Sequence, residues 1–505
     1  MLSLAEYLDR HGYKVIIDNL GDRMVQSSTF DVEKHLKSLS ADIFAIGLHF
    51  QQHSPGALEI ARLCKKFHPH SLVILGGLTA TRFHEEIIRK YNFVNAVIRG
   101  EAEKAFLHFL HGVEKTGQLS DTPNLTYRTN SDEIRVIPMG EPSLNLDEFD
   151  YTRLDLLEPK TSIFNPDSLP RWSLEVCRGC VYNCAICGGS AYSYKTYLGM
   201  DRPAFRSPAK IVEDIRRLNE QGIHILGLYQ DPRMGGGGYT RELLTALSRE
   251  DLEIERLSLD LLIPADEEFI QAIAGLGRTV TLHICPDTGS DSVRKLLGRH
   301  YSNEELLKTI KLCHKYFIPV TSFFSVGLAG ETREKVAETW ELWDKMSSLE
   351  QISLTKGIEW NLGAGLPLGG PIIGPIALDP GSPAFDFPEK YGYRLLYKNL
   401  EKYIQGLSEP SWHQWLNYET DLLNNQDIVG LIIESQAFSI EQREAYEFSS
   451  HSQAAAERLK LKADIAAVNE VNRIMKLDIT ERESALKSLR KQYDSFIKSP
   501  KTEKT

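Results

Sequence analysis

The chain has 505 residues, of which 42% are hydrophobic and 25% are charged, and its formal net charge is −11. This length suggests two to four domains, and the composition is ordinary for a soluble globular protein. The negative charge argues against nonspecific binding to nucleic acid or membranes, because both attract basic surfaces. No apolar run approaches the roughly 18 residues of a spanning helix. We therefore expect no nucleic-acid partner and no membrane contact.

Cysteine usage indicates a reducing compartment. Four of the seven cysteines lie between residues 177 and 187, and Cys64, Cys285 and Cys313 are scattered among apolar neighbours. This pattern is not that of a secreted, disulfide-bonded protein, and no secretory signal is present. We therefore expect a cytoplasmic protein.

Residues 1–117 alternate between helical and strand patterns. A helix is expected near residues 2–8, ending at Gly12, and another over residues 57–67. The expected strands are short and apolar, at residues 15–17, 43–48, 72–75 and 94–98. Such alternation predicts an α/β domain with a parallel, doubly wound sheet, whose ligands lie beyond the carboxyl ends of the strands. The loops that fall at these ends are residues 49–54, 76–81 and 100–103.

Residues 118–170 are interpreted as a connector. A small hairpin is expected from residues 125–128 and 134–137, and residues 142–170 form a proline-containing loop. A loop of this length is typical of an inter-domain linker or a functional segment.

Residues 171–378 form a second series of strands and helices. Strands are expected at residues 173–176, 225–229, 257–263, 279–284, 319–326 and 351–355, with a helix over residues 208–221. Repeated βα units indicate a barrel related to the TIM fold, with catalytic groups at the carboxyl ends of the strands. Cys177, Asp231, Asp287 and Gly327 lie at such ends. The four glycines at residues 235–238 are expected to form a flexible lid.

Residues 379–505 are expected to form a helical C-terminal region. Residues 380–388 resemble a linker, and residues 391–407 and 454–493 have helical patterns. Residues 411–419 are both aromatic and polar, which suits a buried core helix or the wall of a substrate pocket. The tail at residues 499–505 is expected to be disordered.

The most informative stretch is the cysteine motif of Cys180, Cys184 and Cys187. A closed [4Fe-4S] cluster takes four cysteine ligands, so a loop with three leaves one iron open to bind another molecule. The alternative is a zinc site that includes Cys177. Zinc modules usually place a dozen or more residues between their two cysteine pairs, whereas here only three separate Cys180 from Cys184. The spacing therefore favours the iron–sulfur cluster, and zinc remains the alternative.

The residues around this motif resemble the radical SAM signature, beginning with Arg178-Gly179-Cys180. The resemblance implies a partial barrel of six units, (β/α)6, with Cys180, Cys184 and Cys187 as cluster ligands. The open iron would chelate the amino and carboxylate groups of S-adenosylmethionine (SAM), and reduction would give a 5′-deoxyadenosyl radical. Cys177 is at a position that the family does not use for ligation, and we interpret it as a buried strand-end thiol.

The same resemblance suggests SAM-binding residues, namely Gly188, Gly189, Asp287 and Arg299. Asp287-Thr288-Gly289-Ser290 resembles the family's E-S-G-S turn, whose carboxylate holds the ribose hydroxyls. Arg299 matches a position near the SAM carboxylate. Asp287 could instead cap a helix, and Arg299 could be a solvated cation at a helix end. Residues 327–332 resemble the G-x-P-G-E-T turn, with Ala329 in place of proline.

Residues 1–117 resemble the cobalamin-binding domain that precedes many radical SAM domains. The matching pieces are residues 57–61, 76–81 and 99–103. The candidate cobalamin-binding residues are His49, Gly76, Gly77, Thr79, Gly100 and Glu101. The D-x-H-x-x-G motif that supplies a histidine to cobalt elsewhere is absent, and the first strand of the fold is not found. An α/β domain without a corrinoid is the alternative.

The sequence therefore predicts a radical SAM enzyme with a [4Fe-4S] cluster, SAM and cobalamin, which methylates an unactivated carbon of a small molecule or a peptide. An electron donor such as flavodoxin or ferredoxin is implied. The alternatives are radical SAM chemistry without methyl transfer, such as cyclisation or rearrangement, or without a corrinoid. A more distant alternative is an interaction protein that carries zinc or a cluster.

Overall fold

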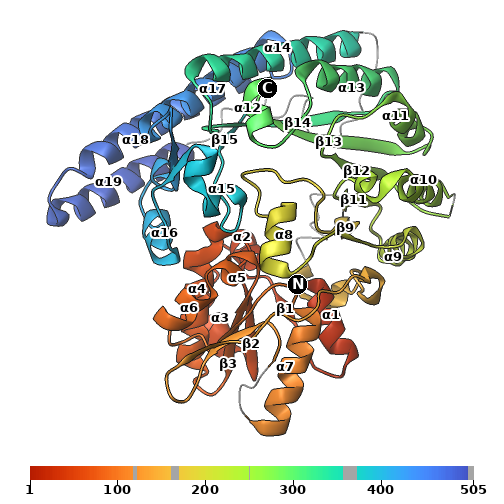
Figure 1. Ribbon diagram of the computed structural model, residues 1–505. Coiled ribbons are helices and arrows are strands. Elements are labelled where there is room, and N and C mark those ends of the chain that lie inside the picture. Colours follow the sequence, from red (N-terminus) through yellow and green to blue (C-terminus); the bar gives the residue numbers. More distant parts are fainter. Residues whose placement is uncertain (118–121, 161–169, 250, 356–371, 499–505) are drawn as a thin grey trace. The chain divides into compact units, whose positions relative to one another are not determined.

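A computed structural model describes residues 1–117, 122–160, 170–249, 251–355 and 372–498 (Figure 1). The expected disordered tail at residues 499–505 lies outside the described residues. The chain divides into two compact units, which we describe separately. The first consists of residues 1–285, 295–321 and 378–391, and the second of residues 286–294, 322–377 and 392–505.

The N-terminal part of the first unit contains a five-stranded sheet in the order β2-β3-β4-β5-β6. Its strands are β2 (Ile43–Gly47), β3 (Leu72–Gly76), β4 (Ala96–Ile98), β5 (Leu125–Arg128) and β6 (Ile134–Val136). Strands β2, β3 and β4 are parallel, as predicted. The hairpin expected in the connector is β5 and β6, which extends this sheet with two antiparallel strands.

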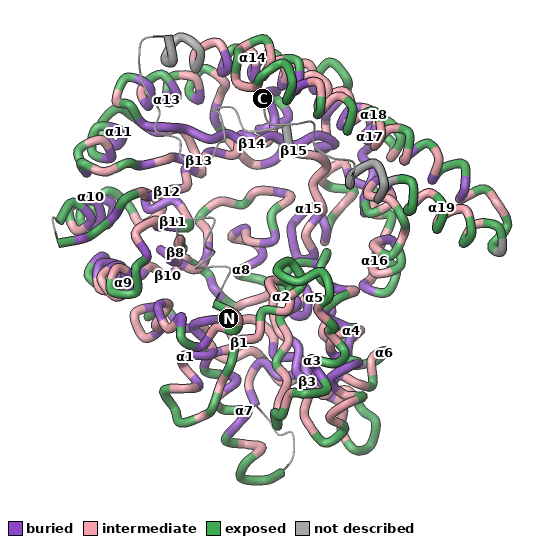
Figure 2. Tube along the Cα trace, turned by 180° about the vertical axis from the view of Figure 1, so that it is seen from behind, coloured by how far each residue is buried: buried purple, intermediate pink, exposed green. Residues whose placement is uncertain are grey.

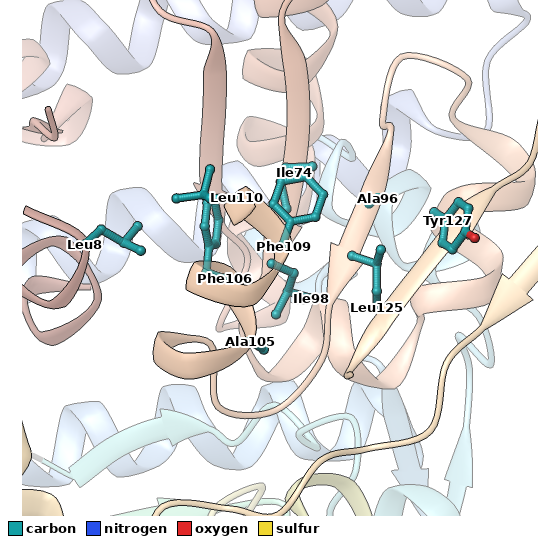
Figure 3. Packing of buried hydrophobic residues seen from close by; sticks show 10 residues of the cluster. All are labelled: Leu8, Ile74, Ala96, Ile98, Ala105, Phe106, Phe109, Leu110, Leu125 and Tyr127. Atoms are coloured by element: carbon teal, nitrogen blue, oxygen red, sulfur yellow. The ribbon is translucent and has the colours of Figure 1, made fainter. Parts of the chain in front are cut away.

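Helices cover both faces of this sheet. The helices of this part of the chain are α1 (Leu2–Arg10), α2 (Leu20–Gln26), α3 (Val32–Ser38), α4 (Ser54–Phe67), α5 (Leu78–Arg82), α6 (His84–Lys90) and α7 (Glu103–Thr116). Residues of α2 are not buried. Phe106 and Phe109 of α7, with Leu8 of α1, pack against Ile74 and Ile98 (Figure 3). Val73 and Leu75 alternate with Ile74 along β3 and are equally buried, so they face the other side of the sheet. Burial of each such side chain contributes about 1.5–3 kcal/mol.

The strand expected at residues 15–17 does not join this sheet. Instead, β1 (Ile17–Asp18) pairs in parallel with β7 (Leu157–Glu158) in a separate two-stranded sheet. Val15 packs against the hydrophobic cluster of α1 and α7, whereas Ile16 is exposed. The expected strand is therefore present only at its last residue, Ile17, and it pairs outside the five-stranded sheet.

A second sheet of the first unit has the strand order β8-β11-β12-β13, and all neighbours are parallel. The strands are β8 (Arg171–Glu175), β11 (Ile225–Tyr229), β12 (Arg256–Leu261) and β13 (Thr279–Asp287). Strand β14 (Val320–Val326) begins beside β13, since the Leu282 amide donates to the Pro319 carbonyl over 2.9 Å. The helices that follow the strands are α9 (Pro208–Glu220), α10 (Gly236–Leu247), α11 (Glu267–Ala274), α12 (Asp291–Leu296) and α13 (Asn303–Lys315).

This succession of parallel strands and helices is the βα series that was predicted. The four glycines expected to form a lid instead close a 3-10 turn, η5 (Pro232–Gly235), and begin α10. The lid prediction is therefore wrong. Glycine has a low helix propensity, so the four glycines did not predict that a helix begins at Gly236.

In the second unit, β14 pairs in parallel with β15 (Ile372–Pro375). The sixth strand of the series is thus β15 and not residues 351–355, which end the helix α14 (Arg333–Thr355). No glycine or proline interrupts residues 333–355, so the helix continues through the segment taken for a strand.

The C-terminal part of the second unit is mainly helical, with α16 (Leu400–Leu407), α17 (Asn425–Ala445), α18 (His451–Ile474) and α19 (Ile479–Lys498). Figure 2 shows α19 as largely exposed. The helix expected over residues 391–407 begins only at Leu400, after a strand β16 (Tyr393–Leu395). Residues 411–419 form a 3-10 turn, η7 (Trp412–Gln414), and enter a strand β17 (Tyr418–Thr420), which pairs with β16. The core-helix interpretation is therefore wrong.

No helix in the described ranges is long and apolar enough to cross a membrane.

Candidate active site

The cysteine motif lies in a loop between a short strand and a helix of the first unit. Strand β9 (Cys177–Arg178) pairs in antiparallel fashion with β10 (Ala204–Phe205), and α8 (Ala191–Leu198) follows the motif. At Gly179, φ is +104°, and a Cβ there would lie 2.7 Å from Pro203 Cα. Only glycine fits this turn. We call residues 179–190 the cluster loop; it ends at Ser190, whose hydroxyl caps α8.

Backbone amides of the cluster loop point at two of the three sulfurs. The amide of Tyr182 donates to Cys180 Sγ, and the amide of Gly189 donates to Cys187 Sγ, each over 3.3 Å. Hydrogen bonds from N–H groups stabilise thiolates, which are the form that binds iron. Burial raises the pKa of the Cys180 thiol, and the nearby guanidinium of Arg299 acts in the opposite direction. The loop therefore provides donors that suit iron ligands.

Cys177 lies just before the cluster loop. It is buried in β9, and its thiol lies 3.8 Å from the Gly179 carbonyl oxygen. This position agrees with the interpretation of Cys177 as a buried strand thiol. Within the described ranges, no three His, Cys, Asp or Glu side chains are grouped so as to hold a single metal ion.

The segment that follows α12 packs against the cluster loop. The Ala185 amide donates to the Leu297 carbonyl over 2.9 Å. A Cβ on Gly298, where φ is +85°, would lie 3.0 Å from the Asn183 carbonyl oxygen. The next residue is Arg299. The structure thus places the SAM candidate Arg299 directly after a residue that packs against the cluster loop.

A second segment, which no sequence motif predicted, contacts the cluster loop at Gly188. The Gly188 amide donates to Asp379 Oδ2 over 3.2 Å, across 191 positions of sequence. We call residues 378–386 the strap; it includes the short helix α15 (Pro383–Asp386). The strap also contacts the cluster loop and α8 through the Ala384 amide, which donates to the Ala185 carbonyl, and the Gly381 carbonyl, which accepts from Ser193 Oγ. Sequence reasoning took this segment for a linker.

Gly188 itself lies between the strap and the N-terminal domain. A Cβ on Gly188 would lie 2.9 Å from Asp379 Cβ and 3.0 Å from Leu78 Cδ2. Leu78 begins α5, directly after the Gly76-Gly77 turn. The strap is tied to the same domain, because Gln51 Nε2 donates to the Leu378 carbonyl over 2.9 Å. The cluster loop and the candidate corrinoid loops are therefore neighbours in the first unit.

Arg178, which begins the radical SAM-like motif, also connects β9 with the N-terminal domain. The Arg178 guanidinium pairs with Glu101 at 3.1 Å, with Glu103 at 2.8 Å and with Glu175 at 3.2 Å. The other oxygen of Glu101 accepts from the Ser143 amide over 2.7 Å. Glu101 was predicted to contact cobalamin, but in the structure both of its oxygens have protein partners. Its carboxylate joins the N-terminal domain to β9, directly before the cluster loop.

The other candidate cobalamin residues gather at the carboxyl ends of β2, β3 and β4. A Cβ on Gly77, where φ is +104°, would lie 2.7 Å from the Leu48 carbonyl oxygen, so the turn after β3 requires glycine. Thr79 Oγ1 donates to the His49 carbonyl over 2.8 Å. The Gly100 amide donates to Thr81 Oγ1 over 2.9 Å. These bonds hold the three loops together at one edge of the sheet.

His49 lies in the loop that follows β2, and its carbonyl accepts from Thr79. Its ring is exposed and lies edge-on to Phe50, with ring centroids 4.7 Å apart. Surrounding protein atoms, and to a smaller extent the N-terminal ammonium group, lower the pKa of His49. A neutral imidazole is the form that binds metal.

The remaining SAM candidate, Asp287, belongs to the second unit, at the end of β13, with φ of +62°. Next to it is a closed polar cluster around Glu331, in the turn that resembles G-x-P-G-E-T. Glu331 Oε2 accepts from the amides of Gly327 and Leu328, each over 2.9 Å. Its Oε1 accepts from Thr288 Oγ1 over 3.2 Å. Glu331 is fully buried, and burial raises its pKa to about 7.

Two families of known domains match this chain. The family of the B12 binding domain matches residues 1–110, and the radical SAM superfamily matches residues 174–342. The fold and the site therefore define a radical SAM domain preceded by a B12-binding domain. The chain belongs to the radical SAM enzymes with such a domain, and its cofactors are a [4Fe-4S] cluster, SAM and cobalamin.

Individual relatives agree with this class. An uncharacterised methyltransferase of Pyrococcus horikoshii is 23% identical over 67% of this chain and 71% of its own length. The hopanoid C-3 methylase of Methylococcus capsulatus is 27% identical over 44% of this chain and 40% of its own length.

Two solved structures have the same fold. The methyltransferase TsrM from Kitasatospora setae, with cobalamin and a [4Fe-4S] cluster bound, has a TM-score of 0.58 at 13% identity and covers 97% of this chain and 96% of its own. The enzyme OxsB, with aqua-cobalamin and SAM bound, has a TM-score of 0.60 at 14% identity and covers 98% of this chain and 68% of its own.

Proposed function

We propose that this enzyme is a cobalamin-dependent radical SAM methyltransferase that acts on an unactivated carbon of a small molecule or a peptide. The observation that carries the proposal is the position of Gly188, the residue after the last cysteine of the motif. Its backbone lies against Leu78, so that a Cβ would come within 3.0 Å of Leu78 Cδ2. Leu78 follows the Gly76-Gly77 turn of the B12-binding domain. Methyl transfer requires the two cofactors to serve one substrate, and these loops are adjacent.

In this proposal residues 1–117 bind cobalamin, residues 171–378 bind the cluster and SAM, and residues 118–170 and 379–505 are the connector and the C-terminal region. The proposed cluster ligands are Cys180, Cys184 and Cys187. The proposed SAM contacts are Gly188, Gly189, Asp287 and Arg299. The proposed corrinoid contacts are His49, Gly76, Gly77, Thr79 and Gly100. Glu101 acts indirectly, since it holds Arg178 beside the cluster loop.

When bound, these groups supply one-electron cleavage of SAM, abstraction of a substrate hydrogen atom and a methyl group for the resulting carbon radical. The chain's own residues bind and orient them. The amides of Tyr182 and Gly189 stabilise two thiolates. The Arg299 guanidinium, beside Cys180, suits the carboxylate of SAM. The electron comes from a donor such as flavodoxin or ferredoxin.

The relatives support methyl transfer but also suggest a second candidate. Two are a methyltransferase and a methylase by name, whereas the anaerobic magnesium-protoporphyrin IX monomethyl ester cyclase of Rubrivivax gelatinosus is 23% identical over 67% of this chain. Ring formation by the same radical step, without methyl transfer, is therefore the alternative.

The test is anaerobic incubation of the purified enzyme with SAM, a reductant and cobalamin. Formation of both 5′-deoxyadenosine and S-adenosylhomocysteine supports a methyltransferase. Formation of 5′-deoxyadenosine alone, with cobalamin bound, favours the ring-forming alternative. Tightly bound zinc without iron or sulfide would contradict both.

We expect Cys184→Ala to abolish both products, because a cluster held by two thiolates of the loop is not retained. The measurement is iron and sulfide content after anaerobic reconstitution, followed by product analysis. Cys177→Ala is the matched control: this thiol is buried in β9, and we expect its removal to leave iron content unchanged. Either product at the wild-type rate from Cys184→Ala would contradict the cluster assignment.

A further inference from the structure

Asp379 is a partly buried residue beside the cluster loop, and only one of its two carboxylate oxygens accepts a hydrogen bond from the described part of the protein. Its Oδ2 accepts one hydrogen bond, from the Gly188 amide. Within the described residues, Oδ1 accepts none, and no Lys, Arg or His side chain pairs with the carboxylate. The residue as a whole is only partly buried. One oxygen is thus fixed on the loop and the other is available.

The neighbouring carboxylates each have an arginine partner. Asp386, at the other end of the strap, accepts from Arg82 Nε, Tyr192 OH and Tyr197 OH over 3.0, 3.1 and 2.6 Å. Glu101 and Glu103 pair with Arg178. An ionised carboxylate that leaves water without a cationic partner costs free energy, so proteins normally supply one. Asp379 has no such partner among the described residues, which leaves its free oxygen suited to a positively charged ligand.

The position of Asp379 is set by the surrounding structure. Hydrogen bonds fix the strap on both sides of it, from Gln51 to the Leu378 carbonyl and from Ser193 to the Gly381 carbonyl. The approach to the cluster loop also depends on Gly188, where a Cβ would lie 2.9 Å from Asp379 Cβ. Gly188 is the residue after Cys187, a candidate iron ligand. A carboxylate fixed against Gly188 is therefore preorganised for a ligand bound at the cluster loop.

We propose that Asp379 binds the positively charged part of SAM. This rests on the proposed function, because it assigns a ligand contact to the same cluster loop. SAM carries a sulfonium and an amino group, and either is complementary to the available oxygen. The carboxylates of Glu101, Glu103, Glu175 and Asp386, which contact β9 or α8, each pair with an arginine. Asp379 pairs with no cationic side chain of the described residues. The strap is thus part of the SAM site and not a linker.

The experiment measures SAM affinity directly, on full-length enzyme reconstituted without oxygen. Asp379→Asn keeps an oxygen that can accept from the Gly188 amide but removes the charge. We expect the Kd for SAM, measured by equilibrium dialysis and expressed per cluster-bearing molecule, to rise about 10- to 100-fold, as for loss of a charge-assisted hydrogen bond. Asp155→Asn, which removes an exposed carboxylate paired with Arg153, is the control that should leave the Kd unchanged.

Two further measurements keep the test decisive. Asp379→Glu restores the charge, so it should bind SAM more tightly than Asp379→Asn; equal affinities would overturn the proposal. S-adenosylhomocysteine keeps the amino group but lacks the sulfonium charge. Equal weakening of both ligands assigns the contact to the amino group, and weakening of SAM alone assigns it to the sulfonium.

Failure of this inference can be told apart from failure of the proposed function. Wild-type affinity of Asp379→Asn for SAM, with iron and sulfide intact, overturns the role of Asp379 alone. A wild-type enzyme that contains no iron and sulfide, or that does not bind SAM, overturns the function as well.

Discussion

Two carboxylates of this enzyme, Glu331 and Asp379, both have a raised pKa but differ in the number of protein groups that donate hydrogen bonds to them. Burial raises the pKa of Glu331 to about 7 and that of Asp379 to about 6. Glu331, in the second unit, accepts from two backbone amides and a hydroxyl. Asp379, in the first unit, accepts from one amide. The pKa shift alone would rank the two as equal candidates for function. The number of hydrogen-bond donors distinguishes them: Glu331 is satisfied by its own turn, whereas Asp379 has an oxygen that a ligand could use.

The largest effect that we expect from this comparison is on stability at Glu331. Glu331→Ala leaves the amides of Gly327 and Leu328 and the Thr288 hydroxyl without their acceptor inside the protein. Each buried unsatisfied donor costs about 1–3 kcal/mol, so we expect a loss of about 3 kcal/mol or more in the free energy of unfolding. Denaturant unfolding followed by circular dichroism measures it.

The matched variant for this prediction is Asp379→Ala, which removes one acceptor at a partly buried site. Its loss should be at least about threefold smaller, in keeping with a single hydrogen bond. Equal losses for the two alanine variants would show that the donor count does not distinguish the sites.

A pH dependence follows from the raised pKa of Glu331. The carboxyl stays protonated up to about pH 7 in the folded enzyme but loses its proton near pH 4.5 when unfolded. Between these values the folded state binds more protons, so stability is highest at the low end and falls as pH rises toward 7. The slope from one such group is at most about 1.4 kcal/mol per pH unit.

Glu331→Gln isolates this contribution, since glutamine keeps an acceptor oxygen and does not titrate. We expect the difference in unfolding free energy between wild type and Glu331→Gln to shift in favour of the variant as pH rises from 4.5 to 7. A constant difference over this range would contradict the assignment of a raised pKa.

The smallest effect expected is that of Asp379→Asn on folding. Asparagine retains an oxygen for the Gly188 amide, and no cationic partner is lost within the described residues. We expect a change within about 0.5 kcal/mol in unfolding free energy. A large destabilisation would mean that Asp379 is a structural group like Glu331, and it would weaken the contrast between them.

Local patterns predicted much of the fold. Residues 225–229 are strand β11 as expected, and the parallel order of β2, β3 and β4 follows from apolar runs that alternate with helices. The predictions were wrong where a local sequence pattern did not determine the secondary structure. Gly392, with φ of +76°, starts a strand where helical periodicity was seen, and residues 351–355 continue a helix that lacks any breaker.

The candidate site divides in the same way. The three cysteines and the glycines that follow them are contiguous, so their spacing carried the chemistry. Arg299 was found through a short motif, and the structure places it beside Cys180. Asp379 could not be found, because its contact with Gly188 joins segments 191 positions apart. Glu101 was assigned to cobalamin from its loop, whereas its pairing with Arg178 depends on the folded arrangement.

The pairing of Arg178 also limits how this enzyme can be divided. A fragment that starts at residue 170 would keep Glu175 but lose Glu101 and Glu103, and with them two of the three carboxylates around a guanidinium only 12% exposed. Because Arg178 lies two positions before Cys180, the electrostatic imbalance would arise beside the iron-binding loop. Chimeras that exchange the corrinoid module therefore need to bring both acidic residues with the transplanted segment.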